Sequence, residues 1–144
     1  KSLGGGIPFG ATLLRPGLGK IPPAVHGSTF GGNPLACAAS LAAIDFIEEQ
    51  NLLAKTAGNG AWFLNALRGI ESPLIREVRG LGLMIGVELK QKTAPYVAEL
   101  AARGVLVLTA GLTVLRFLPP LVIERSDLET VIETVAAVLR EPGG

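Results

Sequence analysis

The pattern of apolar and polar residues in the first half of the chain predicts two consecutive helices. Asn33 is a favourable N-cap residue and Pro34 suits the first helical position, so we expect a helix from there to about Gln50. The body of this helix, ACAASLAAIDF, is rich in alanine, which indicates close packing against a neighbour. A second helix is expected over about 52–67, and it carries several large apolar side chains: Leu53, Trp62, Phe63 and Leu67.

In the second half of the chain the pattern changes to the alternation that is typical of strands. IREVRG and LMIGVEL predict a strand pair, or one bent strand, within residues 75–89. A helix over about 94–103 is expected to stop at Gly104. VLVL and TVLRFL, which lie before and after Ala110–Gly111, predict two further strands.

A capping box and an apolar stripe mark the last helix. Ser126 and Glu129 have the spacing of a capping box, in which each side chain satisfies a backbone amide at the helix start. We therefore expect a compact α/β domain from about Glu71 onward. The stripe that would face its core contains Leu128, Val131, Ile132, Val135, Val138 and Leu139.

The first thirty residues have the composition of loops, because glycine and proline gather there. Within them, ATLL at residues 11–14 is a short apolar run that predicts a buried strand. The longest apolar run of the chain, 105–123, approaches the length of a membrane span. Arg116 lies inside this run and Pro119–Pro120 interrupts it, so we expect two short strands there instead.

The length and composition of the chain allow at most one ordinary globular domain. The 144 residues are 49% hydrophobic and 17% charged, which allows a single core. A net charge of +1 gives no broad electrostatic surface for nucleic acid or an anionic membrane, so any bound anion must be held locally. One cysteine, Cys37, and one histidine, His26, form neither an internal disulfide nor the usual zinc site, so no metal site is expected.

The chain begins with Lys1 instead of methionine, and no signal peptide follows it. We therefore expect a fragment of a longer, cytoplasmic protein.

Arg116 is the residue whose position is most informative chemically. Strand alternation places it on the same face as Val114 and Leu118. If that face is covered, an unpaired guanidinium there costs several kcal/mol, so an anion should meet it. Two kinds of partner stay open: an internal carboxylate, Glu88 or Glu77, or the carboxylate of a substrate.

Other candidates are weak when each is considered alone. Lys1 has the features of any solvated lysine, and His26 and Cys37 are more often ordinary loop or core residues than catalysts. GSTFGGN offers hydroxyls and backbone amides suited to phosphate, but by itself it predicts only a turn. GLGLMIG has GxGxxxG spacing and enters a predicted strand, so we reject a dinucleotide site.

Three separated motifs together resemble class III aminotransferases. KSLGGGIPFGA, residues 1–11, resembles the segment that carries that family's cofactor lysine. HGSTFGGNPLACAA, residues 26–39, resembles the segment that reaches across the dimer to the neighbouring subunit's cofactor phosphate. VRGLGLMIGVEL and VLRFLPPLVI resemble the small domain. Within the class, the motifs look most like acetylornithine aminotransferase and its relative that acts on carrier-protein-linked aminoadipate semialdehyde.

The resemblance implies an α/β fold, the C-terminal part of a fold-type-I transferase that depends on pyridoxal 5'-phosphate (PLP). Residues 1–33 would end the large cofactor-binding domain and include the dimer loop, 34–70 would be connecting helices, and 71–144 the small α/β domain. The complete enzyme would be a homodimer. Upstream residues would carry the rest of the cofactor site, so this chain alone would be inactive.

The resemblance also assigns roles to four residues. Lys1 would hold the cofactor covalently and act as the general base. Thr29, helped by Ser28, would donate hydrogen bonds to the cofactor phosphate of the partner subunit. Arg116 would pair with the substrate α-carboxylate through a planar two-point contact.

The implied reaction moves an amino group between N-acetylornithine, or a carrier-linked or N-acetyl lysine precursor, and 2-oxoglutarate, in arginine or lysine biosynthesis. Ornithine, succinylornithine and 4-aminobutyrate stay open as amino donors. A local basic patch at Lys90, Lys92 and Arg103 would suit an acidic amino-group carrier protein. The remaining alternative is a non-enzymatic α/β binding module that uses Arg116 to hold an acidic partner.

Overall fold

The structure is a computed structural model that describes residues 3–140 and divides the chain into two compact units. The first unit spans Lys1–Asn51 and the second spans Leu52–Gly144. The three-part division expected from the sequence, with boundaries after residues 33 and 70, stays a prediction. Lys1 itself lies outside the described residues.

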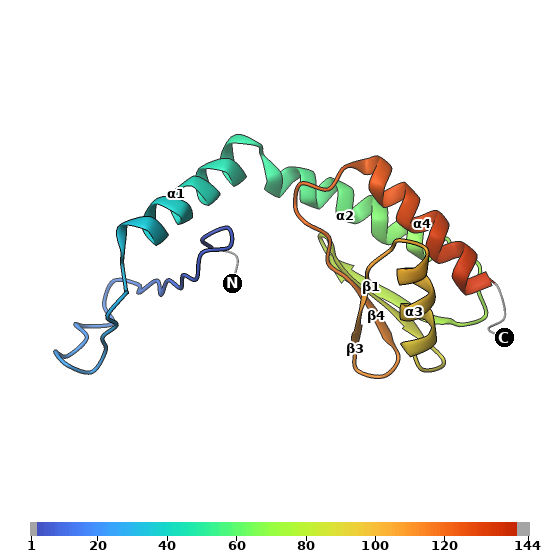
Figure 1. The fold of residues 1–144 in the computed structure, drawn as a ribbon, viewed down its shortest axis with the longest axis horizontal. Coiled ribbons are helices and arrows are strands. Elements are labelled where there is room, and N and C mark those ends of the chain that lie inside the picture. Colours follow the sequence, from blue (N-terminus) through green and yellow to red (C-terminus); the bar gives the residue numbers. More distant parts are fainter. Residues whose placement is uncertain (1–2, 141–144) are drawn as a thin grey trace. The chain divides into compact units, whose positions relative to one another are not determined.

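Helix α1 (Pro34–Glu49) is the only regular element in the described part of the first unit (Figure 1). Asn33 has an extended backbone, with φ −64° and ψ 147°, and its side-chain oxygen accepts a hydrogen bond from the Ala36 amide at 3.0 Å. This bond satisfies one of the amides that have no partner inside the helix. The predicted helix start is therefore confirmed.

The expected strand at residues 11–14 is wrong. The segment is irregular, and Leu13 is 96% exposed. A strand needs a neighbour that pairs with its backbone groups. Within the described part of the first unit, the only bridge joins Gly4 to Ile7, so these four residues have no pairing partner there.

The second unit combines three helices with a four-stranded antiparallel sheet (Figure 1). The sheet order is β1-β2-β4-β3. Of the two expectations for residues 75–89, the strand pair is confirmed, because β1 and β2 form a hairpin in which Leu81 pairs with Met84. The elements are α2 (Leu52–Arg68), β1 (Ile75–Leu81), β2 (Met84–Leu89), α3 (Ala94–Ala102), β3 (Leu108–Ala110), β4 (Val114–Phe117) and α4 (Arg125–Arg140).

The turn of this hairpin touches helix α2 directly. Gly82 in the turn has a φ of +54°, a conformation that glycine adopts readily. A Cβ built on Gly60 of α2 would lie only 2.3 Å from the carbonyl carbon and oxygen of Gly82. Glycine in the middle of α2 weakens the helix, but here it allows two backbones to touch.

Two predicted boundaries differ from the structure. Strand β3 begins at Leu108 instead of Val105, and Leu108 pairs with Arg116 of β4. Helix α4 begins at Arg125, and the Leu128 amide donates to the Glu124 carbonyl at 3.3 Å. Ser126 therefore lies inside the first turn, and the predicted capping box is wrong.

One apolar core joins the helices to one face of the sheet. Phe63 on α2 meets Phe117 on β4 edge to face, with ring centroids 5.8 Å apart. The predicted stripe of the last helix faces this core, since Leu128, Val135, Val138 and Leu139 are buried and Val131 and Ile132 pack against it. Among the described residues, no helix is both long and apolar enough to cross a membrane.

Candidate functional site

The charged residues of the second unit gather on the sheet face that is turned away from the core, which we call the outer face. Along β2, Ile85, Val87 and Leu89 are buried in the core, so the residues between them point outward. Residues that pair across neighbouring strands lie on the same face, so the strand pairing shows which residues of β1, β3 and β4 also point outward. The outer face contains Glu77, Arg79, Leu81, Met84, Gly86, Glu88, Leu108, Ala110, Val114 and Arg116.

Arg116 occupies the centre of this face. It lies on β4 between Gly86 of β2 and Leu108 of β3, and it shares the face with Val114. Its neighbours in the strand, Leu115 and Phe117, are buried in the core. The alternation predicted from the sequence is therefore confirmed for Arg116 and Val114.

The Nε atom of Arg116 is buried and has no hydrogen-bond partner. The residue as a whole is only partly buried, so the rest of its side chain remains accessible. A buried donor without an acceptor costs about 1–3 kcal/mol. The part of the side chain that remains accessible can still bind an anion, because a guanidinium offers several N–H donors.

The two internal carboxylates that stayed open as partners of Arg116 pair with other arginines instead. Arg79 Nη1 donates to Glu77 Oε2 at 2.7 Å and to Glu88 Oε2 at 2.7 Å. Arg76 Nη1 donates to Glu88 Oε1 at 3.1 Å. Neither carboxylate forms an ion pair with Arg116 in the described part of the chain, and a substrate carboxylate as its partner stays a prediction.

This pairing changes the acid–base properties of the outer face. The hydrogen bond from Arg79 is the main cause that lowers the pKa of Glu88 below the usual glutamate value of 4.5, and the charges of Arg79 and Arg76 act in the same direction. The hydrogen bond to Glu88 and the charge of Glu77 likewise raise the pKa of Arg79. Glu88 is therefore fully ionised at neutral pH.

A β-bulge brings Arg76 to the outer face. Strand alternation from Val78 would turn Arg76 toward the core. The register between β1 and β2 shifts between Ile75 and Glu77, so β1 contains one extra residue at this point. Arg76 consequently reaches Glu88, which sequence alternation alone does not predict.

Ser28 and Thr29 lie in a turn of the first unit, just before α1, and both are exposed. The Gly31 amide donates to the Ser28 carbonyl at 3.4 Å, and a Cβ on Gly31 would lie 3.0 Å from the Ser28 Cβ. The turn is therefore tight, and its two hydroxyls are accessible. Ser28 and Thr29 belong to the first unit, and Arg116 belongs to the second.

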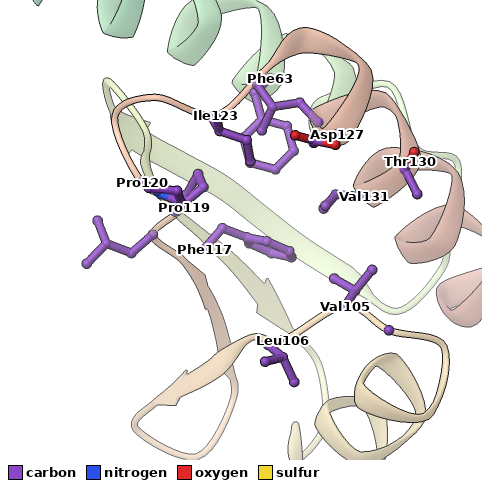
Figure 2. Close-up of a pocket in the computed structure, with 13 residues that line it drawn as sticks. Phe63, Val105, Leu106, Phe117, Pro119, Pro120, Ile123, Asp127, Thr130 and Val131 are labelled. Atoms are coloured by element: carbon purple, nitrogen blue, oxygen red, sulfur yellow. The ribbon is translucent and has the colours of Figure 1, made fainter. Parts of the chain in front are cut away.

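A cavity that the sequence did not predict lies in the second unit, between β4 and α4 (Figure 2). Its volume is about 420 Å³, and Phe63, Phe117 and Ile123 form much of its apolar wall. Asp127 and Thr130 of α4 add polar groups to its lining. The sequence feature that could have indicated this cavity is Pro119–Pro120. The two prolines follow the end of β4 and belong to the lining of the cavity.

The family model described as "Aminotransferase class-III" matches residues 1–139. The chain belongs to the class III aminotransferases. The α/β fold expected from the sequence is confirmed, and it matches the C-terminal portion of class III aminotransferase structures.

Related class III enzymes give a finer comparison. Ornithine aminotransferase of Bacillus subtilis (strain 168) is 46% identical over 142 residues, which are 97% of this chain and 35% of that protein. A structure of ornithine aminotransferase from Toxoplasma gondii is 34% identical with a TM-score of 0.76, over 82% of this chain and 29% of that one. A structure of acetylornithine aminotransferase from Elizabethkingia anophelis is 30% identical with a TM-score of 0.77, over 83% of this chain and 33% of that one. The chain thus spans about a third of the length of its relatives.

PLP is the cofactor of class III aminotransferases, and the Toxoplasma gondii structure contains it in partial occupancy at the active site. The exposed hydroxyls of Ser28 and Thr29 fit such a group, because they can donate hydrogen bonds to its phosphate oxygens. The cofactor lysine implied by the motifs, Lys1, lies outside the described residues.

Proposed function

We propose that this chain forms the C-terminal part of a homodimeric, PLP-dependent aminotransferase that moves an amino group between ornithine and 2-oxoglutarate. The observation that carries the proposal is the class III match over residues 1–139. Ornithine is supported by the relatives, since the Bacillus subtilis protein at 46% identity is an ornithine aminotransferase. Because the chain covers 35% of that enzyme, the activity belongs to the longer protein.

N-acetylornithine is the second candidate for the amino donor. The sequence motifs suggest it first, and the Elizabethkingia anophelis structure with a TM-score of 0.77 supports it. Plain ornithine is better supported than the acetylated donor, because relatives at 44–46% identity are ornithine aminotransferases. A carrier-linked donor has less support, because Arg103 of the expected basic patch pairs with Glu99 at 2.7 Å.

Lys1, Ser28 and Thr29 would hold the cofactor and move the proton. When bound, PLP supplies the electron sink that makes the C–H bond of the substrate acidic. Lys1 Nζ would hold the cofactor covalently and would act as the general base that takes the proton from the carbon that carries the reacting amino group. Ser28 and Thr29 donate hydrogen bonds to phosphate oxygens of the partner subunit's cofactor.

Arg116 would orient the substrate. Its guanidinium binds the α-carboxylate through two parallel hydrogen bonds, which fixes the position of the neighbouring carbon. The ion pairs of Glu77 and Glu88 with Arg79 and Arg76 support this role, because neither carboxylate then occupies the partly exposed side chain of Arg116. Nitrogen is conserved in the exchange, since 2-oxoglutarate leaves as glutamate and the donor leaves as an oxo compound.

The absorbance spectrum of the full-length enzyme with PLP tests this proposal. We expect a band near the visible edge from lysine-bound cofactor, its loss in Lys1→Ala, and its retention in the control Lys20→Ala, another lysine of the first unit. The band should change on adding ornithine. A change only with N-acetylornithine would replace the proposed donor. A band that survives Lys1→Ala would remove Lys1 from the mechanism and favour the non-enzymatic binding module.

A further inference from the structure

Glu88 lies between two arginines on the outer face. The pairing of the strands sets Arg79 opposite Gly86 and Gly86 opposite Arg116, and it sets Glu88 opposite Glu77 on one side and opposite Val114 on the other. Glu88 is therefore the diagonal neighbour of both Arg79 and Arg116. Diagonal neighbours in an antiparallel sheet lie about 7–8 Å apart, within reach of long charged side chains.

Of these two arginines, only Arg79 holds Glu88. Arg79 takes Oε2 at 2.7 Å and Arg76 takes Oε1 at 3.1 Å, so each carboxylate oxygen has its own guanidinium. Arg79 is further fixed by Glu77 at 2.7 Å. Arg116 makes no ion pair with either carboxylate in the described part of the chain.

We propose that Arg79, assisted by Arg76, is a positioning residue that keeps the Glu88 carboxylate away from Arg116, so that Arg116 stays available to the carboxylate of the substrate. The inference rests on the proposed role of Arg116. The inference explains why Arg116 is available to a substrate: Glu88 is held by Arg79 and Arg76, and therefore does not pair with Arg116.

The charges of the outer face support this arrangement. Three guanidinium groups face two carboxylates, and the pairing leaves the excess positive charge on Arg116. If Arg79 were absent, Glu88 would keep only Arg76, which is 57% exposed and weakly held. The freed carboxylate oxygen would then have Arg116 as the nearest unpaired cation on the neighbouring strand.

An ion pair between Glu88 and Arg116 would compete with the substrate. A substrate carboxylate would have to displace Glu88 before it binds, which weakens binding and leaves the chemical step unchanged. The expected signature is a higher KM with a nearly constant kcat. Removing the Glu88 charge should abolish the competition, whether Arg79 is present or not.

Steady-state kinetics of the full-length enzyme with 2-oxoglutarate tests the inference. For Arg79→Met we expect KM to rise roughly threefold to fivefold, the factor that corresponds to a partly exposed ion pair, with kcat nearly unchanged. The double variant Arg79→Met/Glu88→Gln should return KM to the wild-type value. Arg79→Lys, which keeps the charge, should lie between wild type and Arg79→Met. Arg103→Met removes a surface arginine that pairs with Glu99 on α3, and it should leave KM unchanged.

Each failure identifies the step that is wrong. If Arg116→Met raises KM but Arg79→Met does not, Arg79 is not a positioning residue. If the double variant keeps the high KM of Arg79→Met, Arg79 acts on the substrate directly or through the fold, and the inference is overturned. If Arg116→Met itself leaves KM unchanged, the proposed role of Arg116 fails first. Retention of the lysine-bound cofactor band in every variant shows that the enzyme has folded.

Discussion

Arg116 and Glu88 are diagonal neighbours with opposite charges, and yet the structure pairs Glu88 with Arg79 and Arg76. At the residue scale, the proposed role of Arg116 in binding a substrate carboxylate depends on this choice of partners. A guanidinium that is already paired inside the protein offers little to a substrate carboxylate. The unpaired Nε of Arg116 therefore predicts that binding and stability respond differently to substitution.

Arg116→Met should weaken substrate binding without weakening the fold. We expect KM for 2-oxoglutarate to rise roughly 10- to 100-fold, because a charge-assisted contact contributes about 1.5–3 kcal/mol. The thermal midpoint should stay constant or rise, since no hydrogen bond of the Nε atom is lost. Steady-state kinetics and thermal unfolding of the full-length enzyme measure the two effects. A large fall in the midpoint would show that Arg116 stabilises the fold through a partner.

Glu88 predicts a loss of stability in acid. Its pKa in the folded chain lies below the usual 4.5, so the stabilisation is fully present above 4.5 and disappears as the pH falls through the lowered pKa. Arg79 stays protonated throughout this range and adds no pH dependence. Urea unfolding of wild type and Glu88→Gln at neutral and acidic pH should give a stability difference that shrinks below pH 4.5. A difference that is independent of pH would show that the glutamate charge contributes nothing.

At the element scale, the hairpin of β1 and β2 is fixed on α2 by direct contact between Gly60 and Gly82. This contact explains why a helix with a glycine in its middle is retained. The helix loses some intrinsic stability at this glycine, but a larger residue would separate the hairpin turn from the helix.

Gly60→Ala should therefore destabilise the protein, although alanine favours helices. Its Cβ would lie 2.3 Å from Gly82 backbone atoms, so we expect a loss of about 1–3 kcal/mol from overpacking. Gly58→Ala is the matched control, because a Cβ there meets nothing within 4 Å, and it should stabilise α2 by up to about 1 kcal/mol. Chemical denaturation measures both. Equal effects of the two substitutions would contradict the proposed contact.

At the scale of the whole molecule, the match to the Bacillus subtilis ornithine aminotransferase covers 97% of this chain but only 35% of that enzyme. Many large apolar side chains of the first unit are exposed, among them Leu13, Phe30 and Leu41. Such surfaces are typical of segments that pack against further protein. Under the proposed function, catalysis requires the rest of the enzyme.

The purified chain of 144 residues should accordingly show no transaminase activity with ornithine and 2-oxoglutarate in the presence of PLP. The full-length enzyme should be active under the same conditions and should behave as a dimer in size-exclusion chromatography. Glutamate formation provides the assay for both. Activity of the chain alone would contradict the assignment of the remaining cofactor contacts to other residues.

Features that depend on near neighbours along the chain were predictable from the amino-acid sequence alone. Asn33 and Pro34 placed the start of α1, and alternation placed Arg116 away from the core, because caps and strand faces depend on only a few consecutive residues. The joint motifs also indicated the class III family, which the comparison confirmed, although ornithine is now better supported than acetylornithine as the donor.

Features that depend on pairing between distant segments became visible in the folded chain alone. The bulge that turns Arg76 outward and the pairing of Leu108, the first residue of β3, with Arg116 follow from strand register. The ion pairs of Glu88 with Arg79 and Arg76 depend in addition on how these side chains lie on the folded sheet. Register is set by the hairpin and the core together, so no local pattern contains it. For the same reason residues 11–14 are not a strand, since an apolar run pairs only where another backbone lies beside it.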